Sequence, residues 1–133
     1  MNKLYLLILS FVCLFAFSAC EGGNDGDQLS FRAREAALGG SVLIVKNNNK
    51  KETVVIDAVL SRSGERREYK ATRTLKPGDS DELGAMQFGH RVTADSEITV
   101  IMYGKDAAGQ VIEKEKYRIT INKLHELNVT KLL

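Results

Sequence analysis

Few side chains in this chain of 133 residues are of the kind that catalyses reactions. It has two histidines, His90 and His125, and two cysteines, Cys13 and Cys20. A nucleophilic hydroxyl needs a base beside it and a third group that orients that base. No serine or threonine stands in a turn typical of such a nucleophile. We therefore predict that both histidines are surface residues and that the chain has no catalytic residue.

The acidic residues could serve as cation ligands or as a pair of catalytic carboxylates. The run DSDE at 79–82 offers the oxygen ligands that Ca²⁺ prefers, but it lacks further oxygens at a fixed spacing. We interpret it as a solvated turn and predict no metal and no cofactor. Glu113 and Glu115 lie two apart in a predicted strand, so they should point to the same side. A glycosidase needs two carboxylates across a cleft, which a flat strand does not supply.

The densest charge in the chain is the run RSGERREYK at 62–70, which should form a hairpin. It could bind an acidic glycan or a protein, or its interleaved glutamates could pair with its own basic residues. Loops on a rigid sandwich often carry function, and a second predicted loop follows residue 104. If the domain binds a partner, we expect these two loops to form the contact surface through Arg62, Arg66, Arg67, Lys105 and Asp106.

These residues must be positioned by a series of short strands. From residue 41 onward, short β-branched runs alternate with turn residues at a spacing of about 8–12 residues, which is typical of an antiparallel sandwich. Residues 29–40 could form a short helix or a first edge strand, and 81–88 should form a bulged edge strand. The pattern predicts an all-β fold, a single antiparallel β-sandwich of about seven strands spanning residues 41–133.

Two passages resemble bacterial immunoglobulin-like and fibronectin-like domains. TVIMYGKDAAGQVI at 99–112 is similar to their strand, turn and strand segments, and LKPGDS at 75–80 is similar to their Pro-Gly turn. The chain has no tryptophan, whereas immunoglobulin domains bury one. The resemblance implies an immunoglobulin-like sandwich.

The chain begins with one positive charge, Lys3, followed by the apolar run LYLLILSFVCLFAF at 4–17. This run is shorter than the roughly 20 residues that span a bilayer, so it is typical of an export signal that is removed. Residues 17–20, FSAC, resemble the lipobox of bacterial lipoproteins. That resemblance implies removal of residues 1–19 and acylation of Cys20. The alternative is an ordinary secreted protein cut near Ala19, with Cys20 a free thiol.

The acidic stretch EGGNDGDQ at 21–28 follows Cys20 directly. It resembles the surface-export signals of Bacteroidota-type lipoproteins, although a solvated linker of this composition remains the alternative. We predict that residues 20–40 form the acylated cysteine and a flexible tether. Two acyl chains suffice for stable membrane anchoring, so the lipid bilayer is an expected partner and the outer membrane the expected location.

Charge and composition restrict the function further. The chain has 19 basic and 17 acidic residues, and removal of Lys3 with the signal leaves it nearly neutral. We therefore expect no nucleic-acid binding, which needs a clustered basic face. The sequence predicts an envelope-anchored, non-catalytic binding or structural module, with a surface protein or glycan as its partner. The alternatives are a cell-surface enzyme or enzyme inhibitor, and a strand-accepting subunit of a surface assembly.

Overall fold

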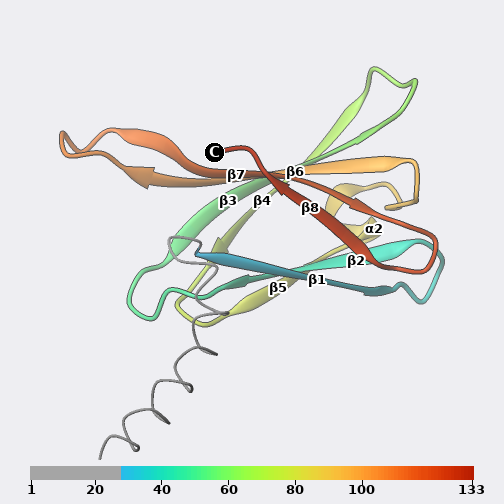
Figure 1. Cartoon of the computed structure of the whole chain (residues 1–133), viewed down its shortest axis with the longest axis horizontal. Coiled ribbons are helices and arrows are strands. Elements are labelled where there is room, and N and C mark those ends of the chain that lie inside the picture. Colours follow the sequence, from blue (N-terminus) through green and yellow to red (C-terminus); the bar gives the residue numbers. More distant parts are fainter. Residues whose placement is uncertain (1–27) are drawn as a thin grey trace, which may run out of the picture.

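The computed structural model describes residues 28–133, which form two packed antiparallel β-sheets (Figure 1). One sheet has three strands in the order β1-β2-β5, and the other has five in the order β4-β3-β6-β7-β8. The predicted all-β antiparallel sandwich is confirmed, with eight strands where about seven were expected. The predicted signal segment, Cys20 and residues 21–27 of the tether lie outside the described residues.

The strands and one helical turn follow one another along the chain with short connections. In chain order they are β1 (Leu29–Glu35), β2 (Ser41–Asn47), β3 (Val54–Arg62), β4 (Glu68–Leu75), β5 (Ser80–Leu83), α2 (Ala85–Phe88), β6 (Ser96–Lys105), β7 (Val111–Ile121) and β8 (Leu127–Lys131).

The sandwich begins at Leu29, not at residue 41. Strand β1 pairs with β2 along its whole length, from Leu29 opposite Asn47 to the β1–β2 turn. Leu29 is buried, and Phe31 and Ala33 pack against the same core. Residues 29–35 therefore belong to the folded domain and not to the tether, because their alternating apolar side chains cover one face of the core.

The strand order of the sandwich can be compared with that of immunoglobulin domains. In such domains strands A, B and E share one sheet, and C, F and G share the other. Here β1, β2 and β5 occupy the first set of positions, and β3, β6 and β7 occupy the second. Strand β4 extends the second sheet beyond β3, and β8 extends it beyond β7.

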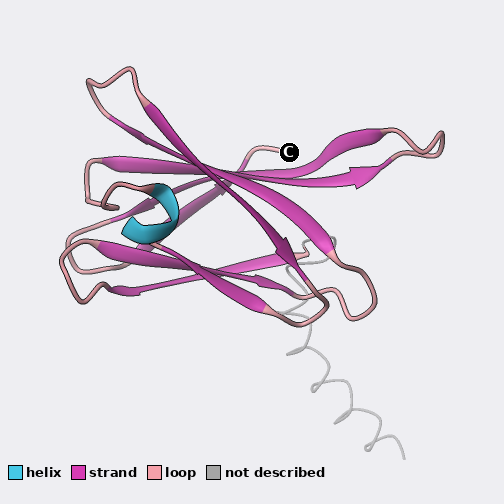
Figure 2. Cartoon of the chain, turned by 180° about the vertical axis from the view of Figure 1, so that it is seen from behind, coloured by secondary structure: helices cyan, strands magenta, loops and turns pink. Residues whose placement is uncertain are grey.

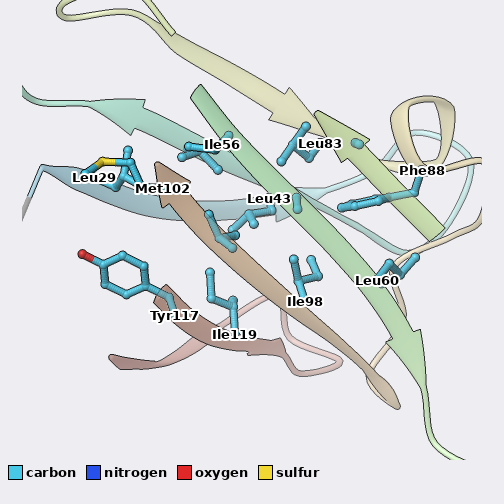
Figure 3. Close-up of a cluster of buried hydrophobic side chains, with 14 of the residues drawn as sticks. Leu29, Leu43, Ile56, Leu60, Leu83, Phe88, Ile98, Met102, Tyr117 and Ile119 are labelled. Carbon is cyan, nitrogen blue, oxygen red and sulfur yellow. The ribbon is translucent and has the colours of Figure 1, made fainter. Parts of the chain in front are cut away.

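An apolar core fills the space between the two sheets (Figure 3). Alternate residues of each strand point inward, because successive side chains of a strand face opposite sides. Burial of each large aliphatic side chain contributes about 1.5–3 kcal/mol. The fully buried side chains include Leu43, Ile56, Leu60, Leu83, Ile98 and Ile119.

Residues 81–88 do not form the single bulged strand that the sequence predicts. Strand β5 ends at Leu83, and α2 makes one helical turn that buries Phe88 in the core. Gly89 ends this turn with a φ of 81°, in the left-handed region that glycine adopts readily. A local periodicity argument cannot find a single turn of this kind.

The two ends of the sandwich carry different loops (Figures 1 and 2). Along β6, Ser96 lies opposite Arg62 at one end and Lys105 lies opposite Val111 at the other. A ten-residue strand spans roughly 30 Å. We call the end with Gln28, the β2–β3 loop and the β6–β7 hairpin the tether end. The end with the β3–β4 hairpin and α2 is the opposite end.

Candidate functional site

The structure separates the two loops that the sequence combined into one contact surface. Arg62, Arg66 and Arg67 lie at the opposite end, whereas Lys105 and Asp106 lie at the tether end, about the length of β6 away. Figure 1 shows the β3–β4 hairpin and the β6–β7 hairpin projecting at opposite ends of the molecule. One small ligand or one peptide of a few residues cannot contact both loops, so each end must be considered separately.

At the opposite end, Arg62 holds the β3–β4 hairpin against the loop that precedes β6. Its Nη2 donates to Asp95 Oδ2 at 3.1 Å, and its Nη1 lies 3.6 Å from Glu65 Oε2. Its Nη1 also donates to His90 Nε2 at 3.1 Å. A guanidinium has donors but no acceptor, so His90 Nε2 must accept and its proton must be on Nδ1. Arg62 therefore has a structural role. The Nε2 lone pair that His90 would need as a general base already accepts a hydrogen bond.

Electrostatics and ring contacts reinforce this arrangement. The hydrogen bond to Asp95 raises the pKa of Arg62. The Thr93 hydroxyl, followed by Arg62, lowers the pKa of Asp95. The Tyr69 ring stacks on His90 with centroids 4.7 Å apart. Within the hairpin, Arg62 and Glu65 form the ion pair that the sequence left open as an alternative, whereas Arg62 also pairs with Asp95 and Lys70 pairs with Asp57, both outside the hairpin.

His125 at the opposite end contacts a serine that sequence reasoning did not single out. Its Nδ1 lies 2.8 Å from Ser41 Oγ. Ser41 is 4% exposed, so a substrate could not reach this hydroxyl. The hydrogen bond connects the start of β2 to the β7–β8 turn and so joins the two sheets. No sequence signal could have shown this pair, because the two residues are 84 positions apart.

The acidic residues also have structural roles. Asp81 pairs with Arg73 at 2.7 Å, and Glu82 pairs with Arg34. Within residues 28–133 no group of three or more histidine, cysteine, aspartate and glutamate side chains is placed to hold a metal ion. Asp106 Oδ1 accepts backbone N–H groups of the β6–β7 turn, from residues 108 and 110, at 2.9 Å each. It shapes the turn in the way that aspartate commonly does.

Glu113 and Glu115 do not share a face, contrary to the expectation from their spacing. A β-bulge shifts the pairing of β6 with β7 between Met102 and Tyr103. Met102 lies opposite Glu115, whereas Tyr103 lies opposite Glu113. Lys114 is the extra residue in β7. As a result Glu113 is exposed, whereas Glu115 is buried at 5% exposure, because a bulge shifts the alternation by one residue.

The tether end contains a concave region that we call the arm notch. It lies between the β6–β7 hairpin on one side and the start of β3 with Gln28 on the other, and it has a volume of about 830 Å³. This volume falls in the usual range of ligand pockets, roughly 300–1,000 Å³. Its lining combines aliphatic, aromatic and charged side chains: Gln28, Glu52, Thr53, Val54, Val55, Met102, Tyr103, Gly104, Lys105, Val111 and Lys114.

Buried and half-buried polar contacts fix two walls of the arm notch. The Gln28 N–H donates to both carboxylate oxygens of Glu115 at 3.2 Å, and the Tyr117 hydroxyl donates to Glu115 Oε1 at 2.6 Å. On the other face of the sheet, the Tyr103 hydroxyl donates to Asp57 Oδ2 at 2.8 Å. Gln28 and Tyr103 are therefore held in place before any ligand arrives, which lowers the entropy cost of binding.

In the described part of the chain, no helix has the length and apolar character needed to cross a membrane. Comparison with known proteins found no matching family model, no matching curated protein and no matching solved structure. The functional interpretation therefore depends on the geometry of residues 28–133 and on the sequence pattern before them.

Proposed function

We propose that this protein is an envelope-anchored lipoprotein whose small β-sandwich is a non-catalytic binding module. The observation that carries this proposal is the arm notch, which lies between the β2–β3 and β6–β7 connections. The corresponding connections of immunoglobulin variable domains, B–C and F–G, form part of the antigen-binding surface. A partner bound there would contact preformed walls and an aliphatic floor. The partner is a protein or glycan of the cell surface.

The proposed anchor is Cys20, acylated after removal of residues 1–19. The sequence pattern supports it through the apolar run at 4–17 and the small residue before the cysteine. Gln28, which starts the described residues, lines the arm notch. A chain segment from Cys20 to Gln28 could reach at most about 30 Å when extended. The arm notch would then face the membrane side of the domain, and the β3–β4 hairpin would point away from it.

The catalytic alternative has less support, because each histidine already has a structural hydrogen bond. His90 Nε2 accepts from Arg62, and His125 contacts the buried Ser41. Nucleophilic catalysis requires an accessible nucleophile beside a free base. A serine that is 4% exposed does not meet that requirement.

A strand-accepting role is the second candidate, and one observation favours it. Within the described residues, β8 pairs with β7 only over Tyr117–Ile121, so 111–115 has a neighbouring strand on the β6 side alone. An exposed edge can accept a strand from another chain. However, bulges and lysines are features that protect edges from pairing, and this edge carries both at Lys114.

Site-specific photo-crosslinking in intact cells tests the proposed binding module. A photo-reactive phenylalanine analogue would replace Thr53, an exposed residue of the arm notch, or, as a control, Arg66 at the opposite end. We expect a discrete crosslinked product from position 53 and none from position 66. Products from position 66 alone would move the binding surface to the β3–β4 hairpin. Absence of a product from both positions would contradict a binding module.

A further inference from the structure

We infer that the arm notch binds an extended, acidic segment of a protein partner, with a carboxylate held by Lys105 and Lys114 and aliphatic side chains on its floor. This inference rests on the proposed function of the arm notch as a binding site and adds the chemistry of its partner. It depends on three features of the described residues: the β-bulge, the approach of Lys114 to Gly104, and the absence of ion pairs at the two lysines.

The β-bulge sets the direction of Lys114. Without an extra residue in β7, strict alternation would place positions 113 and 115 on one face and 114 on the other. The bulge puts Glu113 beside Tyr103 on the outer face and leaves Lys114 among the residues that line the arm notch. Bulges commonly re-aim a side chain beside a functional site. Lys114 thus reaches the notch because of a local irregularity in the sheet.

Gly104 provides the space through which Lys114 crosses β6. A Cβ atom at position 104 would lie 2.5 Å from Lys114 Cγ and 3.1 Å from its Cε. The φ of Gly104 lies outside the left-handed region, so the turn geometry does not require glycine there. A glycine inside a strand commonly marks a close approach of another group. At this position the approaching group is the aliphatic stem of Lys114.

Neither lysine has a salt bridge within residues 28–133, and the two differ from the other unpaired basic residues there in that they line the arm notch. Salt bridges occupy basic side chains on both sheets: Arg34, Arg62, Lys70, Arg73 and Arg118. Lys105 and Lys114 line the same concave region, and Glu52 is the acid of that lining. The lining therefore has a net charge of +1 and a preference for an anionic group.

The shape of the arm notch favours an extended peptide over a compact ligand. The ladder between β3 and β6 ends where Val55 lies opposite Tyr103. Beyond that pair, Gly104 and Lys105 have β7 as their neighbouring strand in the described structure, so one edge of their backbone faces the notch. A short extended segment could hydrogen-bond to this edge while its alternate side chains contact the apolar part of the lining. The exposed apolar residues of that lining are Val55 and Val111, and Val54 and Met102 lie buried beside them.

The test compares two fluorescent pentapeptides, Leu-Glu-Val-Asp-Leu and its uncharged counterpart Leu-Gln-Val-Asn-Leu. Binding to the whole chain, purified in a neutral detergent, is measured by fluorescence anisotropy at low ionic strength. We expect the acidic peptide to bind about tenfold more tightly, since two exposed ion pairs together supply an effect of that order. Added salt should reduce the difference, because exposed charges are screened.

Matched variants assign the preference to the two lysines. The double variant Lys105→Gln, Lys114→Gln should lose the preference for the acidic peptide. The control double variant Lys76→Gln, Lys123→Gln changes the net charge equally at exposed positions outside the notch and should keep it. The variant Gly104→Ala leaves the charge unchanged but displaces Lys114, so it should weaken the preference. Thermal unfolding of each variant shows whether the domain is still folded.

Several results would overturn the inference. Equal affinity for both peptides, binding of neither peptide, or an equal loss in the control double variant would each exclude it. Binding to anionic phospholipid vesicles with no peptide preference would assign the two lysines to a membrane surface instead. A crosslinked product at position 53 together with no peptide preference would leave the binding module intact and reject only the acidic partner.

Discussion

Arg62 has the contacts of a structural residue, although its position in a charged hairpin made it a candidate for ligand binding. It donates hydrogen bonds to Asp95 and His90, both in the connection between α2 and β6, and it lies near Glu65 of its own hairpin. Arg66, in the same run of charge, is exposed and has no salt bridge in the described structure. Two arginines four positions apart therefore differ in role because one of them faces the loop before β6.

This difference can be measured by stability. We expect Arg62→Ala to lower the melting temperature, because it removes the hydrogen bonds that hold Asp95 and His90. We expect Arg66→Ala to leave the melting temperature within experimental error. Differential scanning calorimetry of both variants at one pH checks the pair. Equal melting temperatures for the two variants would show that the contacts of Arg62 contribute nothing.

Asp57 and Tyr103 form a second polar pair, on the outer face of the five-stranded sheet. Burial raises the pKa of Asp57, but hydrogen bonds from Thr72 and Tyr103 and the charge of Lys70 lower it by more, so the pKa lies below its ordinary value of 3.8. The hydrogen bond to Asp57 raises the pKa of Tyr103 above its ordinary value of 10.0. The carboxylate and the neutral phenol are thus both stabilised in the folded protein.

These shifts predict how stability depends on pH. Because the folded pKa of Asp57 is lowered, its contribution is complete above about pH 4 and is lost as pH falls toward the folded pKa. The folded pKa of Tyr103 is raised. Its contribution to stability is therefore complete below about pH 10 and is lost as pH rises through that folded pKa. Urea unfolding of Asp57→Asn should show a weaker loss of stability at acid pH than the wild type. In the same Asp57→Asn variant, the absorbance titration of tyrosine should shift to lower pH. Unfolding and titration curves equal to those of the wild type would contradict the pairing of Asp57 with Tyr103.

At the scale of elements, turns and irregular strand positions determine which side chains meet. The bulge in β7 separates Glu113 from Glu115 and directs Lys114 to the arm notch. The β1–β2 turn requires Gly40, whose φ is 81° and whose Cβ position would lie 2.6 Å from the carbonyl oxygen of Val92. Gly109 in the β6–β7 turn has a similar φ of 83°, but nothing lies within 4 Å of its Cβ position.

These two glycines make a matched comparison. Gly109→Ala should destabilise the protein by about 1–2 kcal/mol, the cost of a left-handed conformation for a residue with a Cβ. Gly40→Ala should cost roughly 2–4 kcal/mol, because the methyl group also overlaps the Val92 carbonyl. Free energies of unfolding from urea titrations measure both. A cost for Gly40→Ala no greater than that for Gly109→Ala would show that the β1–β2 turn adjusts freely.

At the scale of the whole molecule, the chain enters the sandwich at the same end as the arm notch. Gln28 is held by Glu115 and also accepts a hydrogen bond from the Asn48 N–H at 2.7 Å. A membrane anchor on Cys20 would therefore place the arm notch nearer the bilayer than the hairpin around Arg62. A partner of the arm notch would then lie close to the membrane surface.

The proposed acylation of Cys20 can be tested directly. Replacement Cys20→Ser should leave an unprocessed precursor or release soluble protein, because no thiol remains to be acylated. The replacement Ser18→Ala keeps a small residue before the cysteine and should leave the protein in the membrane fraction. Fractionation of cells and mass spectrometry of the N-terminal peptide provide the measurement. An unmodified thiol on Cys20 in the wild type would exclude the lipoprotein assignment.

The sequence by itself determined the fold class. Short β-branched runs between turn residues predicted an antiparallel sandwich, and LKPGDS at 75–80 predicted a turn, in which Gly78 has a φ of 79°. These features are local, because a strand repeats every two residues and a turn depends on its own few residues. They can therefore be found without knowing what lies opposite.

The tertiary structure alone decided which polar residues meet. Ser41 bonds His125 over 84 positions, and Arg62 bonds His90 over 28. The register shift opposite Met102 depends on how β7 pairs with β6, so the spacing of nearby residues could not reveal it. The arm notch exists because β6 continues beyond its last pair with β3, and that divergence depends on the packing of strands that are distant in sequence.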